Sequence, residues 1–325
     1  HRYLLASRLA ETRLLDQQFR QDRDSLEIAP EALAANLDEL ISRYRELLVL
    51  LDEPEAVHAA EYRLYDLMFI EAERRYADTA EDTFDPVIAG YEKLLAENPA
   101  HSENHRLRYQ LARIRDLKGD RAAQRRELEA LIDQYPDSPL WVEAQFRRAE
   151  LLFIEGDYPA AKTGYAAVIR ASDGSPDERQ QTFATHSFYM KGWSEFRQGD
   201  YDTAVISYSH ALDRLLPDNA TPGDLDRQHR TLVEDLFRVL GLTFTYQGGA
   251  SAVADLFERV GPKPWEPLVY ERYAQHLQER EQYTDAIAVY QQVIDAHPFS
   301  EQAPHYAVRI MDIYRAGGFP EAIPE

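Results

Sequence analysis

The stretch YMKGWSEFRQGDYDTAVISYSHAL (residues 189–212) decides the fold class of this chain. It places a small residue, Gly192, before the turn signal Gly199-Asp200-Tyr201, and a second small residue, Ala204, directly after it. Bulky apolar residues recur three or four positions apart on both sides, and such residues share one face of a helix. The stretch therefore predicts two helices joined by a tight turn and packed against each other at the small residues.

The same turn signal recurs along the chain. Copies or variants of it stand at Gly119-Asp120, Gly156-Asp157-Tyr158, Gly199-Asp200-Tyr201, Gly248-Gly249, Glu281-Gln282-Tyr283 and Gly317-Gly318-Phe319, with spacings of 37, 43, 49, 33 and 36 residues. A proline, which cannot continue a helix, usually follows the second helix of a unit, at Pro99, Pro136, Pro217, Pro262 and Pro298. Self-similarity at such a period is typical of stacked helix pairs.

On these residues the chain resembles the tetratricopeptide repeat, a helix–turn–helix unit of about 34 residues. The match is closest at Phe188, Gly192, Phe196, Gly199-Asp200-Tyr201, Ala204, Tyr208 and Ala211, and then at Tyr270, Ala274, Tyr283, Ala286, Tyr290 and Pro298. It covers residues 58–325 as about six to seven degenerate repeats, of which the last is incomplete. The resemblance implies an all-α fold, a right-handed superhelix (α-solenoid) of stacked antiparallel helix pairs.

Three features depart from the family pattern, and one of them is the absence of the tryptophan that commonly opens the first helix in the family. The spacings of 43 and 49 residues imply longer helices or inserted loops at residues 172–181 and 218–226. Arg148 and Lys191 stand beside the small packing residue, where the family usually has leucine.

Residues 1–57 lack the repeated turn signal but carry apolar residues at helical spacing on both sides of Pro30. We expect an N-terminal helical pair, or pairs, that cap the array or continue it, because helix pairs of this size need a neighbour to bury one face. The chain starts at His1, and we expect it to be a processed or cloned fragment of a longer protein.

Composition excludes several classes of function. The net charge of −21 argues against nucleic acid as the main partner, because phosphate binding needs clustered cations. It also favours a basic protein partner. The chain has no cysteine, which removes disulfides and thiolate sites, and no apolar run long enough to insert in a membrane.

No catalytic motif is present, so we expect a non-enzymatic protein without a cofactor. His101 and His105 lie four residues apart, a spacing that could place both on one helical face for a metal. No third ligand is evident, and we predict no metal site.

The resemblance implies instead a concave groove, lined by the first helix of each repeat, that holds a peptide or domain of a partner. The residues expected to line it are Phe146, Phe153, Tyr189, Trp193, Phe196, Arg197, Arg238 and Tyr246. Tyr189, Trp193 and Arg197 form a stripe at i−4, i and i+4, and these residue types are enriched at binding hot spots. The alternative is that Trp193 packs against the following repeat.

Trp141 and Trp265, beside prolines in connecting segments, are expected to act as wedges between repeats.

The connecting segments after Tyr135 and His297 lead through proline and serine into the next helix, in a style similar to repeats of bacterial cell-envelope proteins. We therefore expect a scaffold or adaptor in an envelope complex for outer-membrane assembly, a Tol/TonB-type system or motility, located in the periplasm or, alternatively, the cytoplasm. Two other roles stay open: a structural segment that makes contacts through its ends or convex face, or the regulatory domain of an enzyme whose catalytic part lies outside this sequence. The oligomeric state is not predicted.

Overall fold

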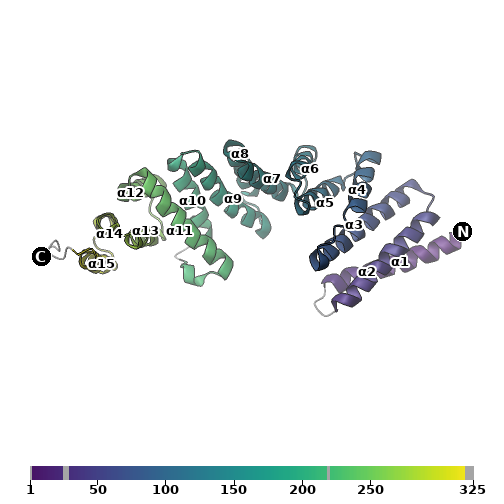
Figure 1. Ribbon diagram of the computed structural model, residues 1–325, viewed down its shortest axis with the longest axis horizontal. Coiled ribbons are helices and arrows are strands. Elements are labelled where there is room, and N and C mark those ends of the chain that lie inside the picture. The colour runs from purple at the N-terminus through teal and green to yellow at the C-terminus, as the bar shows by residue number, and fades with distance from the viewer. Residues whose placement is uncertain (1, 25–28, 218–219, 319–325) are drawn as a thin grey trace. The chain divides into compact units, whose positions relative to one another are not determined.

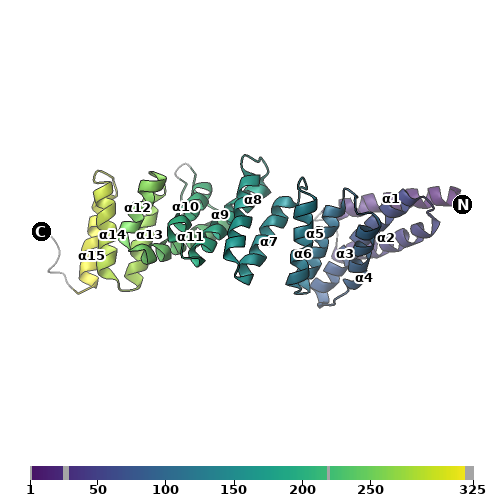
Figure 2. The same cartoon turned by 90° about the horizontal axis from the view of Figure 1, so that it is seen from above.

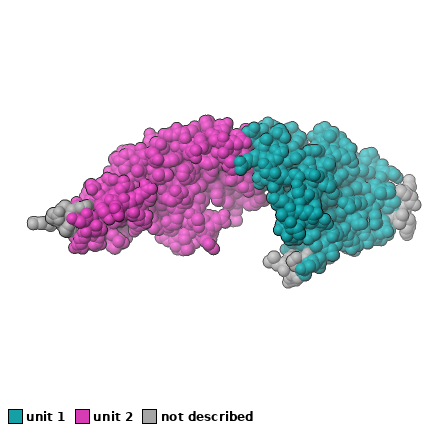
Figure 3. All heavy atoms as spheres, viewed as in Figure 1, with its two compact units in different colours: residues 1–140 teal, residues 141–325 magenta. Residues whose placement is uncertain are grey.

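The computed structural model describes residues 2–24, 29–217 and 220–318, and within these ranges every regular secondary-structure element is a helix (Figure 1). It divides into two compact units, unit 1 with residues 1–140 and unit 2 with residues 141–325 (Figure 3). In each unit, successive helices pack as antiparallel pairs. The predicted all-α fold of stacked helix pairs is confirmed.

Unit 1 begins with three long helices, and each packs against the next. Its helices are α1 (Arg2–Asp24), α2 (Pro30–Leu50), α3 (Pro54–Thr79), α4 (Asp85–Glu97), α5 (Asn104–Leu117) and α6 (Arg121–Gln134). The N-terminal region is helical, as predicted. The expected boundary at residue 57/58 falls inside α3, and the division of the chain into a capping region and repeats stays a prediction.

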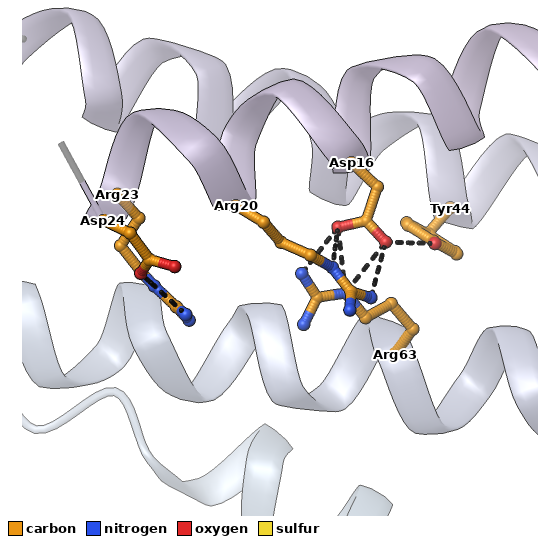
Figure 4. A network of polar contacts seen from close by, with 6 residues as sticks. All are labelled: Asp16, Arg20, Arg23, Asp24, Tyr44 and Arg63. Atoms are coloured by element: carbon orange, nitrogen blue, oxygen red, sulfur yellow. Dashed lines mark hydrogen bonds and ion pairs between the residues drawn. The ribbon is translucent and has the colours of Figure 1, made fainter.

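A buried carboxylate joins the first three helices of unit 1 (Figure 4). Asp16 of α1 accepts hydrogen bonds from Arg63 of α3 (2.6 Å) and from the hydroxyl of Tyr44 of α2 (3.1 Å), and Arg20 adds an ion pair at 3.1 Å. Burial alone would raise the pKa of Asp16, but the hydrogen bonds from Arg63 and Arg20 outweigh it and lower that pKa. These contacts fix α1 and α3 to each other through charge.

Within residues 141–217 and 220–318, unit 2 has four pairs of α-helices and one further α-helix. The helices are α7 (Trp141–Glu155), α8 (Tyr158–Ser172), α9 (Glu178–Arg197), α10 (Tyr201–Leu215), α11 (Arg227–Gln247), α12 (Ala250–Val260), α13 (Glu266–Glu279), α14 (Tyr283–Ala296) and α15 (Ala303–Ala316). Figure 2 shows α13, α14 and α15 side by side, in agreement with their packing contacts. A short 3₁₀ helix, Pro222–Asp224, lies in the segment between α10 and α11.

The first five predicted turn signals lie between paired helices, whereas the sixth follows α15, and its Phe319 lies outside the described residues. Gly156 and Gly199 adopt φ of +86° and +77°, a left-handed conformation that suits glycine, and the following aspartate is the N-cap of the next helix. Asp157, for example, accepts a hydrogen bond from the backbone N–H of Ala160 at 3.1 Å. In the α13–α14 pair, Glu281 takes the glycine position at φ +60°.

The two long spacings arise mainly from long helices. α9 has 20 residues and α11 has 21, whereas α7, α8 and α10 have 15 each. Of the two predicted insertions, the one at 172–181 is thus largely an extension of α9. The second combines the longer α11 with the connecting segment that holds the 3₁₀ helix.

The close approach of α9 and α10 depends on Gly192. A Cβ atom at this position would lie 2.4 Å from the ring carbon Cε1 of Tyr208, which is fully buried. The nearest contact is thus the Tyr208 ring and not Ala204, the small residue expected to face Gly192. Lys191, which replaces the usual leucine, pairs with the buried Glu195 at 2.6 Å, and Ser207 of α10 donates to the same carboxylate at 2.6 Å.

Trp265 is a wedge between helix pairs, as predicted. Its side chain is buried, its ring lies 5.7 Å from that of Phe257 in α12, and its Nε1–H donates to Asp213 of α10 at 3.1 Å. Trp141 is half-buried and packs on the core of α7 and α8. No helix of the described ranges is both long enough and apolar enough to cross a membrane.

Candidate functional site: an aromatic surface on unit 2

Five aromatic side chains of α9, α10 and α11 form a continuous group, here called the aromatic cluster. Its members are Tyr189, Trp193, Phe196, Tyr201 and Tyr246. The ring centroids of Trp193 lie 6.5 Å from Tyr189 and 5.5 Å from Phe196. Phe196 is 5.3 Å from Tyr201 and 5.5 Å from Tyr246, and the last two rings stack at 5.2 Å.

The helical period explains why these rings meet. Residues 189, 193 and 196 lie four and three positions apart, so they share one face of α9. The same helix presents Gly192 to α10, and this close contact fixes the rotation of α9 about its axis. The length of α11 then brings Tyr246, near its C-terminal end, against Phe196.

The aromatic cluster runs from the core to the surface. Tyr189 lies 6.3 Å from the fully buried Tyr208 ring, Trp193 and Phe196 are half-buried, and Tyr246 is 60% exposed. The cluster thus offers open ring surface on a rigid base, an arrangement that loses little side-chain entropy when a partner binds.

The hydroxyl group of Tyr189 is fixed across the α9–α11 contact. It donates a short hydrogen bond to Asp235 of α11, and Asp235 also accepts from Arg238 at 2.8 Å. Burial and the hydrogen bond to Asp235 raise the pKa of Tyr189 to about 12, so the phenol is neutral at physiological pH. Beside it, a cleft of about 550 Å³ is lined by Tyr189, Arg227, Gln228, Thr231, Leu232 and Asp235.

Arg197 lies at the turn end of α9 and is exposed. Its guanidinium carbon lies 4.7 Å from the ring centroid of Tyr158, and the Tyr158 ring is 5.3 Å from that of Phe153. Arg197 makes no ion pair within the described ranges, so its charge is available to a partner while its plane is supported by an aromatic ring.

The structure thus brings together most of the predicted groove residues. Tyr189, Trp193, Phe196 and Tyr246 belong to the aromatic cluster, Arg238 is paired with Asp235, and Phe153 with Tyr158 supports Arg197. Phe146 is different, because it is 6% exposed and its ring packs 5.2 Å from Phe183 of α9 in the core. Trp193 contacts rings of its own helix, is half-buried, and also packs against the core that includes residues of α10 and α11.

Three residues of this surface were not predicted from the sequence. Tyr158 and Tyr201 were assigned only to the Gly-Asp-Tyr turns, although an aromatic residue at the same place after two turns is a signal in itself. Asp235 had no signal, because a carboxylate in so acidic a chain is uninformative until its partner is known.

The two histidines considered for a metal lie in different surroundings. His101 packs against His58 and Tyr62, whereas the ring of His105 lies near Tyr135 and its Nδ1 lies 2.8 Å from the carbonyl oxygen of Ser102. Among the residues with described positions, no group of three His, Cys, Asp or Glu side chains could hold a metal ion.

Comparison with known proteins identifies the repeat. Residues 271–300, which include most of the α13–α14 pair, match the family model of the tetratricopeptide repeat. This match confirms the resemblance seen in the sequence, and the fold it belongs to is typical of protein–protein interaction scaffolds and typically non-catalytic. A search of curated proteins finds no significant match to the chain.

Solved structures with a similar course of the chain include two that are described as tetratricopeptide repeat proteins. A tetratricopeptide repeat protein from Parabacteroides merdae is 11% identical, with 94% of this chain and 98% of that chain covered and a TM-score of 0.45. The C-terminal part of a TPR repeat-containing protein from Cytophaga hutchinsonii is 15% identical, with coverage of 91% and 98% and a TM-score of 0.44. The apo form of RapI is 12% identical, with coverage of 96% and 98% and a TM-score of 0.49. At such low sequence identity and TM-score, the structural similarity gives no information about binding partners.

Proposed function

We propose that this protein is a non-enzymatic scaffold that binds a polypeptide segment of a partner protein on the aromatic cluster of unit 2. The observation that carries the proposal is the continuous run of rings from the buried Tyr208 to the exposed Tyr246, with Arg197 beside it. Aromatic and arginine side chains near a rigid, partly desolvated surface are the usual hot spots of protein interfaces.

The partner segment is expected to insert apolar side chains among the rings and to place a carboxylate near Arg197. The cleft beside Tyr189 offers room for a further side chain, with Asp235 as an acceptor at its wall. The net charge of −21 favours a partner that is basic as a whole, because long-range attraction accelerates the encounter.

Affinity capture tests the proposal. Native protein and the variants Tyr246→Ala and Arg197→Ala are used to capture partners from envelope and cytosol fractions, and the partner is then titrated as a purified protein. Both residues are exposed, so the variants keep the fold. We expect each to weaken binding by about tenfold or more, the effect of losing an interface anchor.

Phe299→Ala and Arg315→Ala are the matched controls, because they remove an exposed ring and an exposed arginine outside the aromatic cluster. A partner bound equally by native protein, by the two cluster variants and by the controls would contradict the proposal. It would move binding to the ends or the convex face, which is the alternative role as a structural segment.

We also propose that the protein works in a bacterial cell envelope. The support is the similarity of its connecting segments, YPDSP at 135–139 and HPFS at 297–300, to those of repeat proteins in bacterial cell envelopes. Fractionation of the source cells with an antibody against this chain tests the location, and recovery only from the cytosol would contradict it.

A further inference from the structure

Unit 1 has a concave site of a different character, which does not depend on the proposed surface of unit 2. A cleft of about 830 Å³ lies where the first turns of α3 meet the end of α4 and the segment leading into α5. Its walls carry three rings, of His58, Tyr62 and His101, and four carboxylates, of Glu55, Glu61, Glu97 and Glu103.

The three rings face one another closely enough to form one group. Ring centroids are 4.8 Å apart for His58 and His101, 5.1 Å for Tyr62 and His101, and 5.4 Å for His58 and Tyr62. The sequence gives no hint of this group, because 43 residues separate His58 from His101.

Hydrogen bonds hold two of the rings in place. The Tyr62 hydroxyl donates to Oδ1 of the fully buried Asn104 at 3.0 Å, and the Asn104 amide donates to the carbonyl oxygen of Asn98 at 2.8 Å. The backbone N–H of Glu103 donates to Nδ1 of His101 at 3.2 Å, so a neutral His101 carries its proton on Nε2. The rings are therefore oriented before any ligand arrives.

His58 is the least satisfied of the three. Its Nε2 is buried and has no hydrogen-bond partner within the described ranges. Burial and the neighbouring His101 lower the pKa of His58, so its ring is neutral at pH 7 and does not repel a cation.

The carboxylates around the rings exceed the cations that pair with them. Lys93 pairs with Glu61 at 2.6 Å and lies 3.8 Å from Glu97, and Arg106 pairs with Glu103 at 3.2 Å. Glu55 is exposed and makes no ion pair among the described residues. Four carboxylates against two cations leave negative charge beside open aromatic rings.

We propose that this cleft binds an arginine side chain of a partner polypeptide. A guanidinium group is planar and weakly hydrated, so it stacks on aromatic rings, and its several N–H donors reach carboxylates and an imidazole nitrogen at the same time. An ammonium group makes the charge contacts without the stacking, so lysine binds more weakly at the same place.

The test is a titration of the full chain with the end-blocked tripeptide Gly-Arg-Gly, followed by the ring-proton NMR signals of His58 and His101 at pH 7. The same peptide with citrulline in place of arginine is the control ligand, because citrulline keeps the shape and loses the charge. We expect both histidine signals to shift with the arginine peptide and the citrulline peptide to bind about tenfold more weakly. The lysine peptide is expected to lie between them.

Two variants separate the cleft from general charge attraction. Glu55→Gln/Glu97→Gln removes two charges from the wall, and Glu46→Gln removes an exposed charge of α2 that does not line the cleft. We expect Glu55→Gln/Glu97→Gln to weaken binding of the arginine peptide by about fivefold and Glu46→Gln to leave the affinity unchanged. Tyr62→Leu is expected to weaken it as well, whereas Tyr62→Phe, which keeps the ring, retains binding.

Equal affinity for arginine and citrulline peptides would overturn the proposal, as would unchanged binding in Glu55→Gln/Glu97→Gln or an absence of shifts in both histidine signals. Because these measurements concern unit 1 alone, they leave the proposed surface of unit 2 untouched, and failure of one proposal does not decide the other.

Discussion

Helices α1–α3 of unit 1 and the pair α9–α10 of unit 2 are held together by different forces. Between α1 and α3 the central contact is charge, since Asp16 bonds to Arg63 across the helices. Between α9 and α10 the central contact is the close approach of Gly192 to the Tyr208 ring, to which Ser207 of α10 adds a hydrogen bond to Glu195 of the Lys191–Glu195 ion pair. Stability should therefore respond to pH and charge in the first region and to side-chain volume in the second.

The chain offers a direct way to observe the two regions separately. Its three tryptophans, Trp141, Trp193 and Trp265, all belong to unit 2. Tryptophan fluorescence therefore follows the unfolding of unit 2, whereas far-UV circular dichroism follows the helices of both units.

The largest effect is expected for Gly192→Ala. The added Cβ would lie 2.4 Å from a ring atom of the fully buried Tyr208, and overpacking of this kind costs about 3 kcal/mol. Gly90→Ala is the matched change in unit 1, where the added Cβ would lie 2.2 Å from a ring atom of Tyr65, but this ring is half-buried and can move. We expect Gly90→Ala to lower the free energy of unfolding by less than about 1 kcal/mol, because the ring can move and because alanine has a better helix propensity than glycine. Urea unfolding monitored by fluorescence and by circular dichroism measures both variants. An equal loss of unfolding free energy in the two would contradict the expected difference between the regions.

Asp16→Asn comes next. It leaves Arg63, whose side chain is 17% exposed, without its charged partner, and we expect a loss of about 2 kcal/mol, reduced from a fully buried pair because Arg20 is 58% exposed. The loss should show in the circular dichroism transition and leave the tryptophan transition in place. A shift of the tryptophan midpoint instead would mean that the network of Asp16 also supports unit 2.

The pH dependence of the same contact follows from the lowered pKa of Asp16. The unfolded chain, with an aspartate pKa of about 3.9, binds the proton more readily than the folded one, so the stabilisation is complete above that pH and is lost as the pH falls below it. Acid unfolding of native protein and Asp16→Asn, followed by circular dichroism, should therefore show a stability difference that narrows below about pH 4. A difference that stays constant to pH 2 would contradict the assigned pKa direction.

The smallest effect is expected at the turn of the α13–α14 pair. Glu281 adopts φ +60°, a conformation that disfavours a side chain, so Glu281→Gly should stabilise unit 2 by about 0.5 kcal/mol after the extra entropy of glycine in the unfolded chain is counted. Gly199→Ala, at φ +77°, is the reverse change and should destabilise by about 1 kcal/mol. The urea midpoint of tryptophan fluorescence measures both, and shifts of the same sign would contradict this reading of the turns.

The fold was predictable because its signals are local. Gly156, Gly199 and the aspartates after them mark turns within a few residues, and the helical period needs no knowledge of tertiary structure. The partner of Gly192 was not predictable in the same way, because Tyr208 and Ala204 lie on one face of α10 and only the relative rotation of the helices decides which of them makes the contact.

In the candidate sites, too, residues grouped within one helix were predictable, whereas residues grouped by contacts between helices were not. Tyr189, Trp193 and Phe196 follow from spacing within one helix, and the structure places them together. The burial of Phe146 depends on its contact with Phe183 of another helix. The group of His58 and His101 depends likewise on the packing of α3 against the segment before α5. This packing cannot be predicted from a local sequence pattern.

The packing of each helix against its near neighbours in sequence also bears on how the chain reaches its native state. The hydrogen bond from Trp265 to Asp213 links separate helix pairs yet spans only 52 residues of 325. Chains whose contacts are this local search little conformational space before the contacts form, and they fold quickly for their size. Because neighbouring repeats stabilise one another, unit 1 can begin to fold on the ribosome before the rings of unit 2 have been synthesised.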